Sequence, residues 1–115
     1  MNEIRLKRIY DAPEEADGFR VLVDRLWPRG VSKKQAAIDL WMKEVAPSTK
    51  LRKWFHHESG RWEEFVKRYR EELGHKGDLI DELRVRSKDG PLTLVYSARN
   101  EKQNQAVVLK SAIEG

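Results

Sequence analysis

The apolar run at residues 21–23 (VLV) constrains the fold of this chain more than any other stretch of the sequence. Its three residues do not alternate with polar ones, so both sides of the strand that they predict have to be covered by other parts of the chain. Burial on both faces is typical of a central strand in a parallel or mixed sheet with helices on either side. The run therefore indicates an α/β fold.

Four strands are predicted in total. Residues 4–10 (IRLKRIY) place apolar residues between basic ones, residues 19–26 extend the central run, and residues 92–98 (LTLVYSA) are apolar and β-branched. Residues 37–47 (AIDLWMKEVAP) are interpreted as a strand, although their apolar spacing also fits a helix.

Helices are predicted from capping residues and from apolar spacing. Ser32 has the capping-box spacing to a glutamine three residues later, and Ser48 is a second candidate N-cap. Residues 61–74 (RWEEFVKRYREELG) repeat apolar residues at the spacing of an amphipathic helix and end on a glycine. Two further helices are predicted over residues 78–90 and 101–115.

Strands and helices alternate along the chain, and this order implies parallel pairing through right-handed crossovers. A length of 115 residues fits one domain with one core. We therefore predict a single α/β domain over residues 1–115. It is expected to be a small three-layer domain with a mostly parallel sheet of about four strands flanked by helices.

Composition narrows the classes of function. The chain has no cysteine, which excludes disulfides, thiolate chemistry and Cys-ligated zinc or iron–sulfur sites. Its formal net charge is +4, but basic and acidic residues are interspersed, which fits an anionic ligand as well as a solvated surface. No signal-peptide core and no apolar run of membrane-spanning length occurs, so a cytoplasmic protein without membrane contact is expected.

Polar side chains follow the ends of two predicted strands: DRLWPRG after the second strand and YSARNEKQN after the last. In open α/β sheets ligands bind beyond the carboxyl ends of the strands, and the start of the final helix would add free amides that favour an anion. If the two strands are neighbours, these residues form one crevice. The candidate ligand-binding residues are Arg25, Trp27, Arg29, Ser97, Arg99 and Asn104.

The types of these residues predict an anion site. Three arginines near one point would clamp a phosphate, a carboxylate or a nucleotide, with Trp27 stacking on a base. If a reaction occurs, Asp24 is the first candidate for a general base and His56 the second. The structural alternative is an ion pair between Asp24 and Arg25, with Trp27 in a packing corner.

No metal site and no cofactor is expected. The histidines at 56 and 57 are adjacent and diverge on a helix, and no H-E-x-x-H or comparable ligand spacing occurs. The chain also lacks a Walker loop, a G-x-G-x-x-G motif and a nucleophile elbow.

Longer stretches carry a resemblance to a known family: VLVDRLWPRGVSK, D-x-W at 39–41, APSTKLRKWF, RWEEFVKRYREEL and TLVYSARNEKQNQAVVL. They resemble the DUF488 family, and within it the small YeaO-like branch, over nearly the whole chain. The resemblance implies a compact α/β domain and implies no activity.

The wider family has D-V-R after its second strand and a segment C-A-E…C-H-R at its last strand. Asp24 and Arg25 stand at the first place without the intervening residue, and residues 96–98 and 104–106 stand at the second. Both cysteines and the His-Arg pair are missing, so no thiol, redox or metal role carries over. Only the location of the crevice does.

Three functional hypotheses follow. The first is a protein that binds a small anionic molecule in the crevice, as a monomer or a weak homodimer. The second is a nucleic-acid-binding module in which basic helices over residues 48–73 contact phosphates while Trp54 or Tyr69 stacks on bases. The third is a non-catalytic interaction protein that docks through an exposed Trp27. The sequence leaves open whether the chain is an enzyme.

Overall fold

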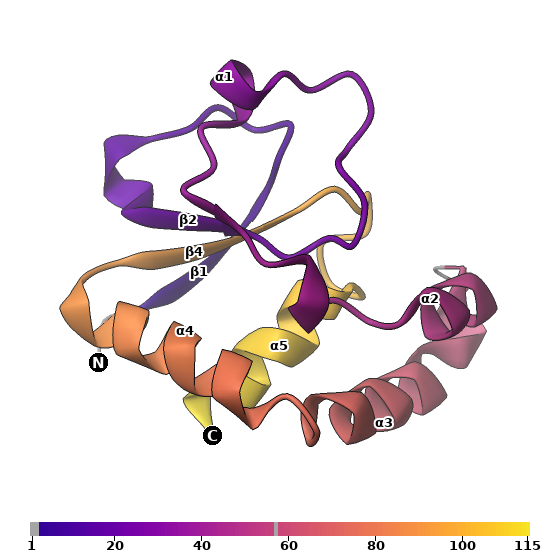
Figure 1. Cartoon of the computed structure of the whole chain (residues 1–115). Coiled ribbons are helices and arrows are strands. Elements are labelled where there is room, and N and C mark those ends of the chain that lie inside the picture. The colour runs from indigo at the N-terminus through magenta and orange to yellow at the C-terminus, as the bar shows by residue number, and fades with distance from the viewer. Residues whose placement is uncertain (1–2, 57) are drawn as a thin grey trace.

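A parallel four-stranded sheet forms the centre of the protein (Figure 1). The computed structural model describes residues 3–56 and 58–115. The order β1-β4-β2-β3 confirms the predicted α/β class and makes β2 and β4 neighbours, as the crevice requires. The strands, all paired in parallel, are β1 (Ile4–Arg8), β2 (Phe19–Leu22), β3 (Leu40–Trp41) and β4 (Leu92–Tyr96).

The two faces of the sheet contribute to two separate apolar clusters. One face brings Val21 into the main core, to which α4 (Gly77–Asp89) and α5 (Gln105–Glu114) add their buried side chains. The opposite face brings Leu22 into a smaller cluster that includes a residue of α1 (Lys33–Ala36). Figure 1 accordingly shows α1 on one side of the sheet and α4 with α5 on the other, which gives three layers.

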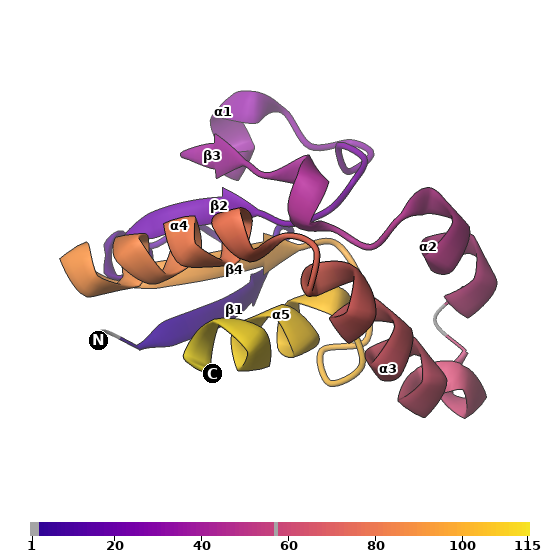
Figure 2. The ribbon, with the colours of Figure 1, turned by 60° about the horizontal axis from the view of Figure 1, so that its bottom comes forward.

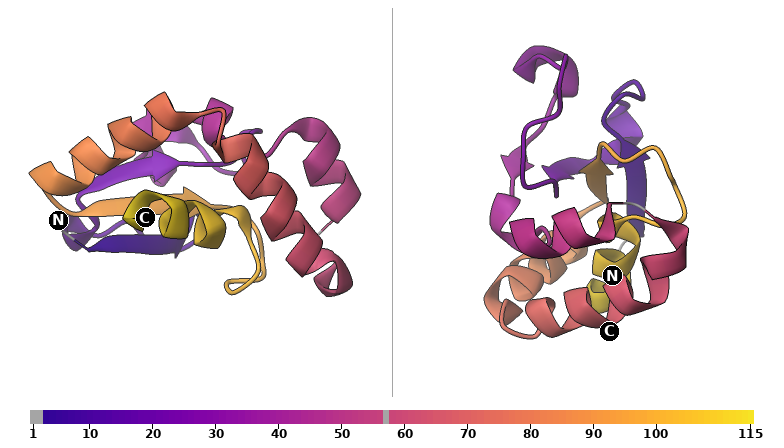
Figure 3. Two further views of the ribbon diagram at one scale, coloured as in Figure 1. Left: turned by 90° about the horizontal axis from the view of Figure 1, so that it is seen from below. Right: turned by 90° about the vertical axis from the view of Figure 1, so that its right-hand side faces the viewer.

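Helices α2 (Thr49–Phe55) and α3 (Trp62–Leu73) lie past the carboxyl ends of the strands, toward which the strand arrows point in Figure 3. Figure 2 shows the same two helices projecting away from the layered body. Phe65 and Tyr69 of α3 are buried in the main core and join this extension to it. No helix in the described part of the chain is long and apolar enough to cross a membrane.

The predicted helix starts at the two serines are confirmed. The hydroxyls of Ser32 and Ser48 each accept a hydrogen bond from the amide three residues later, at 3.1 Å in both cases. The prediction of a strand over 37–47 is only partly confirmed. Strand β3 has two residues, and a 3₁₀ turn, η2 (Lys43–Val45), follows it.

A buried ion pair lies before the start of β2. Asp17 ends the 3₁₀ turn η1 (Glu15–Asp17), is 2% exposed, and contacts Arg20 at 2.7 Å and Lys7 at 3.1 Å. Burial works to raise the pKa of the Asp17 carboxyl, but hydrogen bonds from the Glu14 amide, Lys7 and Arg20 outweigh it. The pKa of Asp17 therefore lies below its ordinary value, and the pair ties η1 to the sheet.

Candidate functional site

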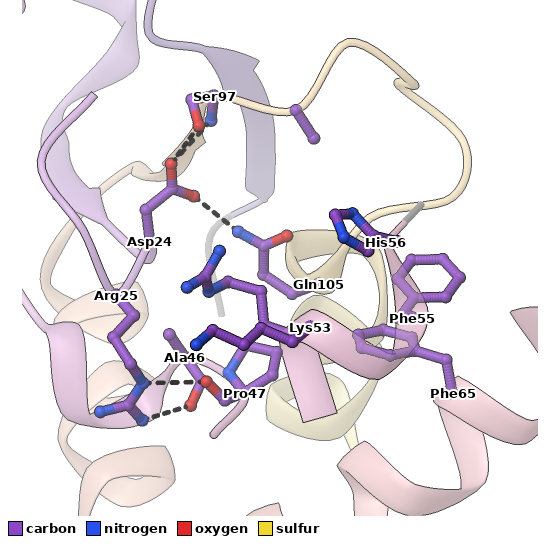
Figure 4. A pocket seen from close by; sticks show the side chains of 12 residues that line it. Asp24, Arg25, Ala46, Pro47, Lys53, Phe55, His56, Phe65, Ser97 and Gln105 are labelled. Atoms are coloured by element: carbon purple, nitrogen blue, oxygen red, sulfur yellow. Dashed lines mark hydrogen bonds between the residues drawn. The ribbon is translucent and has the colours of Figure 1, made fainter. Parts of the chain in front are cut away.

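A cavity of about 180 Å³ lies at the carboxyl ends of β2 and β4, with α2 on its other side (Figure 4). The residues after both strands, the segment before α2, α2 itself and the first turn of α5 contribute to its wall. Segments far apart in the sequence, with Phe65 of α3 among them, thus meet at the edge of the sheet where the sequence predicts a crevice.

Asp24 links the two central strands at this cavity. It follows β2 and is 8% exposed. Its Oδ2 accepts hydrogen bonds from the amide of Ser97 at 3.1 Å and from the Ser97 hydroxyl, and its Oδ1 accepts one from Nε2 of Gln105 at 2.6 Å. The Trp41 indole donates to the backbone carbonyl of Asp24 at 2.8 Å. The carboxylate is therefore held by the residue after β4 and by α5, while β3 holds the backbone of Asp24.

The Asp24 carboxylate differs from that of Asp17 in its partners. Asp17 is paired with cations, whereas amide and hydroxyl groups are the hydrogen-bond donors to Asp24 among the described residues. Burial raises the pKa of the Asp24 carboxyl, and the hydrogen bonds from Ser97 and Gln105 and the charge of Arg52 offset only part of that rise. A buried carboxyl with a raised pKa at a cavity is typical of a functional site.

Ala46 and Pro47 form another part of the wall, and side chains from distant elements hold the backbone carbonyls of residues 45–47. Nε and Nη2 of Arg25 donate to two of these carbonyls at 2.9 and 3.0 Å. The Lys76 ammonium and the Tyr69 hydroxyl donate to carbonyls of the same segment at 3.1 and 2.7 Å. Arg25 therefore uses two of its nitrogens to fix the wall, a structural role that the sequence did not predict.

Arg52 brings a positively charged guanidinium to the cavity lining, and one of its N–H groups has no hydrogen-bond acceptor among the described residues. Its Nε is buried and finds no acceptor among the described residues. Arg25, Arg52 and Lys53 line the cavity, and Asp24 is the one carboxylate in its described lining. A buried donor without a partner costs about 1 to 3 kcal/mol because its lost hydration is not replaced. Arg52 thus brings a positive charge to the cavity, but its Nε is enclosed and reaches an acceptor there only when the side chain turns toward the cavity.

Apolar side chains complete the lining. Two of them are stacked aromatic rings, with centroids 4.2 Å apart and an interplanar angle of 21°. They come from α2 and α3, so the extension beyond the sheet contributes to the apolar lining. The apolar lining residues are Ala46, Pro47, Phe55, Phe65 and Ala98.

Four residues that the sequence assigns to the site line the cavity: Asp24, Arg25, Ser97 and His56. His56 follows the last turn of α2 with φ 48° and ψ 26°. This left-handed conformation is uncommon for a residue with a side chain and favours glycine at the end of a helix. The two candidates for acid–base chemistry, Asp24 and His56, therefore belong to one cavity.

Four other predicted site residues do not line the cavity. Arg29 and Arg99 are exposed outside it. Trp27 is half-buried in the smaller apolar cluster, where its indole donates to the Val31 carbonyl at 2.7 Å. Asn104 is fully buried and caps α5, because its Oδ1 accepts a hydrogen bond from the amide three residues later at 3.2 Å.

Three polar residues of the lining, Arg52, Lys53 and Gln105, were not predicted from the sequence. Arg52 and Lys53 belong to a basic stretch whose charges read as ordinary surface, since nothing in the sequence places α2 against the sheet. Gln105 directly follows Asn104, which was chosen instead. The first turn of the final helix was expected at the crevice, and the side chain at its first position would have been the better choice.

Comparisons with known proteins give the relatives of this chain. A family model described as "Inactive DUF488-N3 subclade" matches residues 3–115. The uncharacterised protein YeaO of Escherichia coli K12 is 49% identical over 106 residues, which cover 92% of each chain. The uncharacterised protein Rv3073c of Mycobacterium tuberculosis H37Rv is 40% identical over 112 residues, 97% of this chain and 94% of its own.

No solved structure matches the chain. The matched region includes every residue described above as part of the cavity, from Asp24 to Gln105. This coverage and the identity to both relatives agree with the resemblance in the sequence, and the chain belongs to the DUF488 family, in its YeaO-like branch.

Proposed function

We propose that this protein binds a small organic anion in the cavity beside Asp24, with the guanidinium of Arg52 as its main partner. The buried Nε of Arg52, which has no acceptor among the described residues, carries this proposal. Lys53 adds a second positive charge to the same lining. An anion that draws the Arg52 guanidinium toward the cavity would supply the acceptor that this enclosed nitrogen lacks.

The volume of the cavity limits the size of the ligand. Pockets for drug-sized molecules measure about 300 to 1,000 Å³, and this cavity measures about 180 Å³. A whole nucleotide exceeds that space. The ligand is therefore a molecule of few atoms, or the charged end of a longer one.

A binding role is favoured over a catalytic one. The Asp24 carboxylate already accepts three hydrogen bonds from Ser97 and Gln105. These bonds favour a structural role in the cavity wall over a role as a general base. The matched family model is itself described as inactive. Both observations support a protein that recognises its ligand without transforming it.

The proposal is tested by titrating the ¹⁵N-labelled protein with sodium acetate and with inorganic phosphate at constant ionic strength. We expect saturable amide shifts at Lys53, Ala98 and Gln105. Arg52→Gln is expected to weaken the binding about ten- to a hundredfold, because it removes a charge-assisted hydrogen bond.

Arg99→Gln is the matched control, since it removes the same charge from an exposed arginine outside the cavity. It should change the affinity less than about twofold, as a screened surface charge does. If both variants lose the same amount of affinity, the loss comes from the change in net charge, and a site at Arg52 is contradicted. The absence of saturable shifts around the cavity with either anion would overturn the proposal.

The nucleic-acid hypothesis finds less support. The expected stacking of Tyr69 on bases is wrong, because Tyr69 is 0% exposed and its hydroxyl donates to a backbone carbonyl. Trp54 already has the guanidinium of Arg68 over its ring at 4.2 Å, and that of Arg61 at 5.4 Å. Docking through Trp27 stays a prediction, since this side chain is half-buried.

A further inference from the structure

The apolar part of the lining narrows the chemical class of the ligand. From it we infer that the cavity takes a monocarboxylate with a compact aromatic or branched apolar body, an inference that rests on the anion site proposed above. The carboxylate lies against Arg52, and the apolar body lies against the stacked rings of Phe55 and Phe65.

The charges around the cavity favour one negative charge over two. Arg52 and Lys53 attract an anion, but the buried carboxylate of Asp24 lines the same space and repels it. Arg25 is partly occupied by the carbonyls that it holds. A phosphate dianion would feel the repulsion of Asp24 twice as strongly as a carboxylate, and it would lose more hydration beside an apolar wall.

The side-on edge of Arg52 suits a carboxylate. A guanidinium presents parallel N–H groups from Nε and one Nη, and a planar carboxylate matches them with two oxygens. The Nε of Arg52 is the buried donor without an acceptor among the described residues. Because this nitrogen is enclosed, the Arg52 side chain has to turn toward the cavity, and a carboxylate bound side-on would then satisfy it and add a second bond to the same guanidinium.

The size and the surface of the cavity suit an apolar body. An engineered cavity of about 150 Å³ lined by apolar side chains is large enough to bind benzene. The cavity here measures about 180 Å³, which leaves space for a ring and a carboxylate. The Phe55 and Phe65 rings line this space, although at 3% and 2% exposure they offer it only a small part of their surface, and the half-buried Ala98 completes its apolar side.

Four probes separate the features of the inferred ligand: benzoate, acetate, inorganic phosphate and benzyl alcohol. Each is titrated into the full chain at constant ionic strength, with amide shifts as the readout. Benzoate is expected to bind at least tenfold more tightly than acetate and phosphate, because only benzoate combines the charge with a buried ring. Nuclear Overhauser contacts from its ring protons to Phe55 and Phe65 are expected in the wild-type protein, which needs no variant.

The outcomes distinguish this inference from the proposed function. If acetate or phosphate binds as tightly as benzoate, with amide shifts at the cavity, the proposed anion site is supported. The inferred ligand class is then overturned. Benzyl alcohol binding as tightly as benzoate shows that the charge is not recognised and overturns both. Binding by none of the four probes also overturns both.

A variant tests whether the apolar body of the ligand lies in the cavity. Ala98→Leu fills the space beside the rings, so it should weaken benzoate at least tenfold and acetate less than threefold. Ala112→Leu is the matched control, because it makes the same change at a half-buried alanine of α5 outside this cavity. If Ala98→Leu leaves the benzoate-to-acetate ratio unchanged, the ring binds elsewhere and the inference is overturned; if that variant fails to fold, the wild-type ring contacts decide.

Discussion

The surroundings of Asp24 change the pKa of its carboxyl group. Burial disfavours its charged form, and its hydrogen-bond donors among the described residues are neutral groups of Ser97 and Gln105. Its pKa is raised above the ordinary value. A carboxyl that holds its proton more tightly in the folded state stabilises the protein at low pH, and this contribution is lost as the pH rises through the folded-state pKa.

Asp24→Asn should therefore change the pH dependence of stability in a defined direction. The free energy of unfolding of the wild type minus that of the variant should fall as the pH rises from the ordinary aspartate pKa through the higher folded-state value. Urea unfolding of both proteins at a series of pH values measures this difference. A difference that is constant or that grows with pH would contradict the raised pKa.

The residue scale also explains which site residues the sequence could predict. Asp24 and Ser97 were predicted because each directly follows a recognisable strand, and parallel neighbours bring such positions together. Asn104 was assigned to the ligand, although its side chain caps α5. An amide that caps a helix and an amide that binds a ligand look the same in a sequence, and only the backbone around them separates the two roles.

Helix α2 is the element that turns a strand end into a cavity. It begins at Ser48, whose amide and hydroxyl donate to the two carboxylate oxygens of Glu72 in α3, at 2.8 and 2.6 Å. The helix has only seven residues, which is too short to be stable alone. Its position therefore depends on α3.

Removing this anchor should loosen α2. Glu72→Ala takes away two charge-assisted hydrogen bonds and should destabilise the protein by about 1 to 3 kcal/mol. It should also speed the exchange of amide hydrogens in α2 more than in the sheet. Glu71→Ala, which removes the same charge from the exposed neighbouring position, is the control. If the amide hydrogens of α2 exchange equally fast in both variants, the position of α2 does not depend on the Glu72 contact and the prediction is wrong.

At the scale of elements, the helices that depend on residues close together in the sequence were predicted correctly. The caps at Ser32 and Ser48 and the apolar spacing of α3 and α4 depend on residues close in sequence, and the structure confirms these helices. The packing of α2 beside the sheet depends on contacts between distant residues, such as Ser48 with Glu72. For that reason Arg52 and Lys53 were missed as lining residues.

At the scale of the whole molecule, two buried aspartates occupy different positions along β2. Asp17 lies before the strand and is paired with Lys7 and Arg20, whereas Asp24 lies after it at the cavity. Their pKa values are shifted in opposite directions, down for Asp17 and up for Asp24. Asp17 forms salt bridges, whereas Asp24, for which no salt bridge is found among the described residues, borders the cavity.

Asp17→Asn should give the opposite pH behaviour from Asp24→Asn. Breaking a buried ion pair costs about 3 to 5 kcal/mol, so the variant should lose roughly that amount near neutral pH. The folded-state pKa of Asp17 is lowered, so the wild-type advantage is present above the unfolded pKa and is lost as the pH falls through the folded-state value. The same urea series measures it, and a loss of equal size at acid pH would contradict the assignment.

The position of β4 between β1 and β2 has a consequence for the time course of synthesis. Ile4 pairs with Leu92, and β4 separates β1 from β2, the strand that follows it in the sequence. Emerging from the ribosome, β1 and β2 expose apolar surface until β4 can insert between them, and long-range pairing of this kind folds slowly. The contact of Gln105 with Asp24 forms later still along the chain, so the cavity wall is completed only when nearly the whole polypeptide has been made.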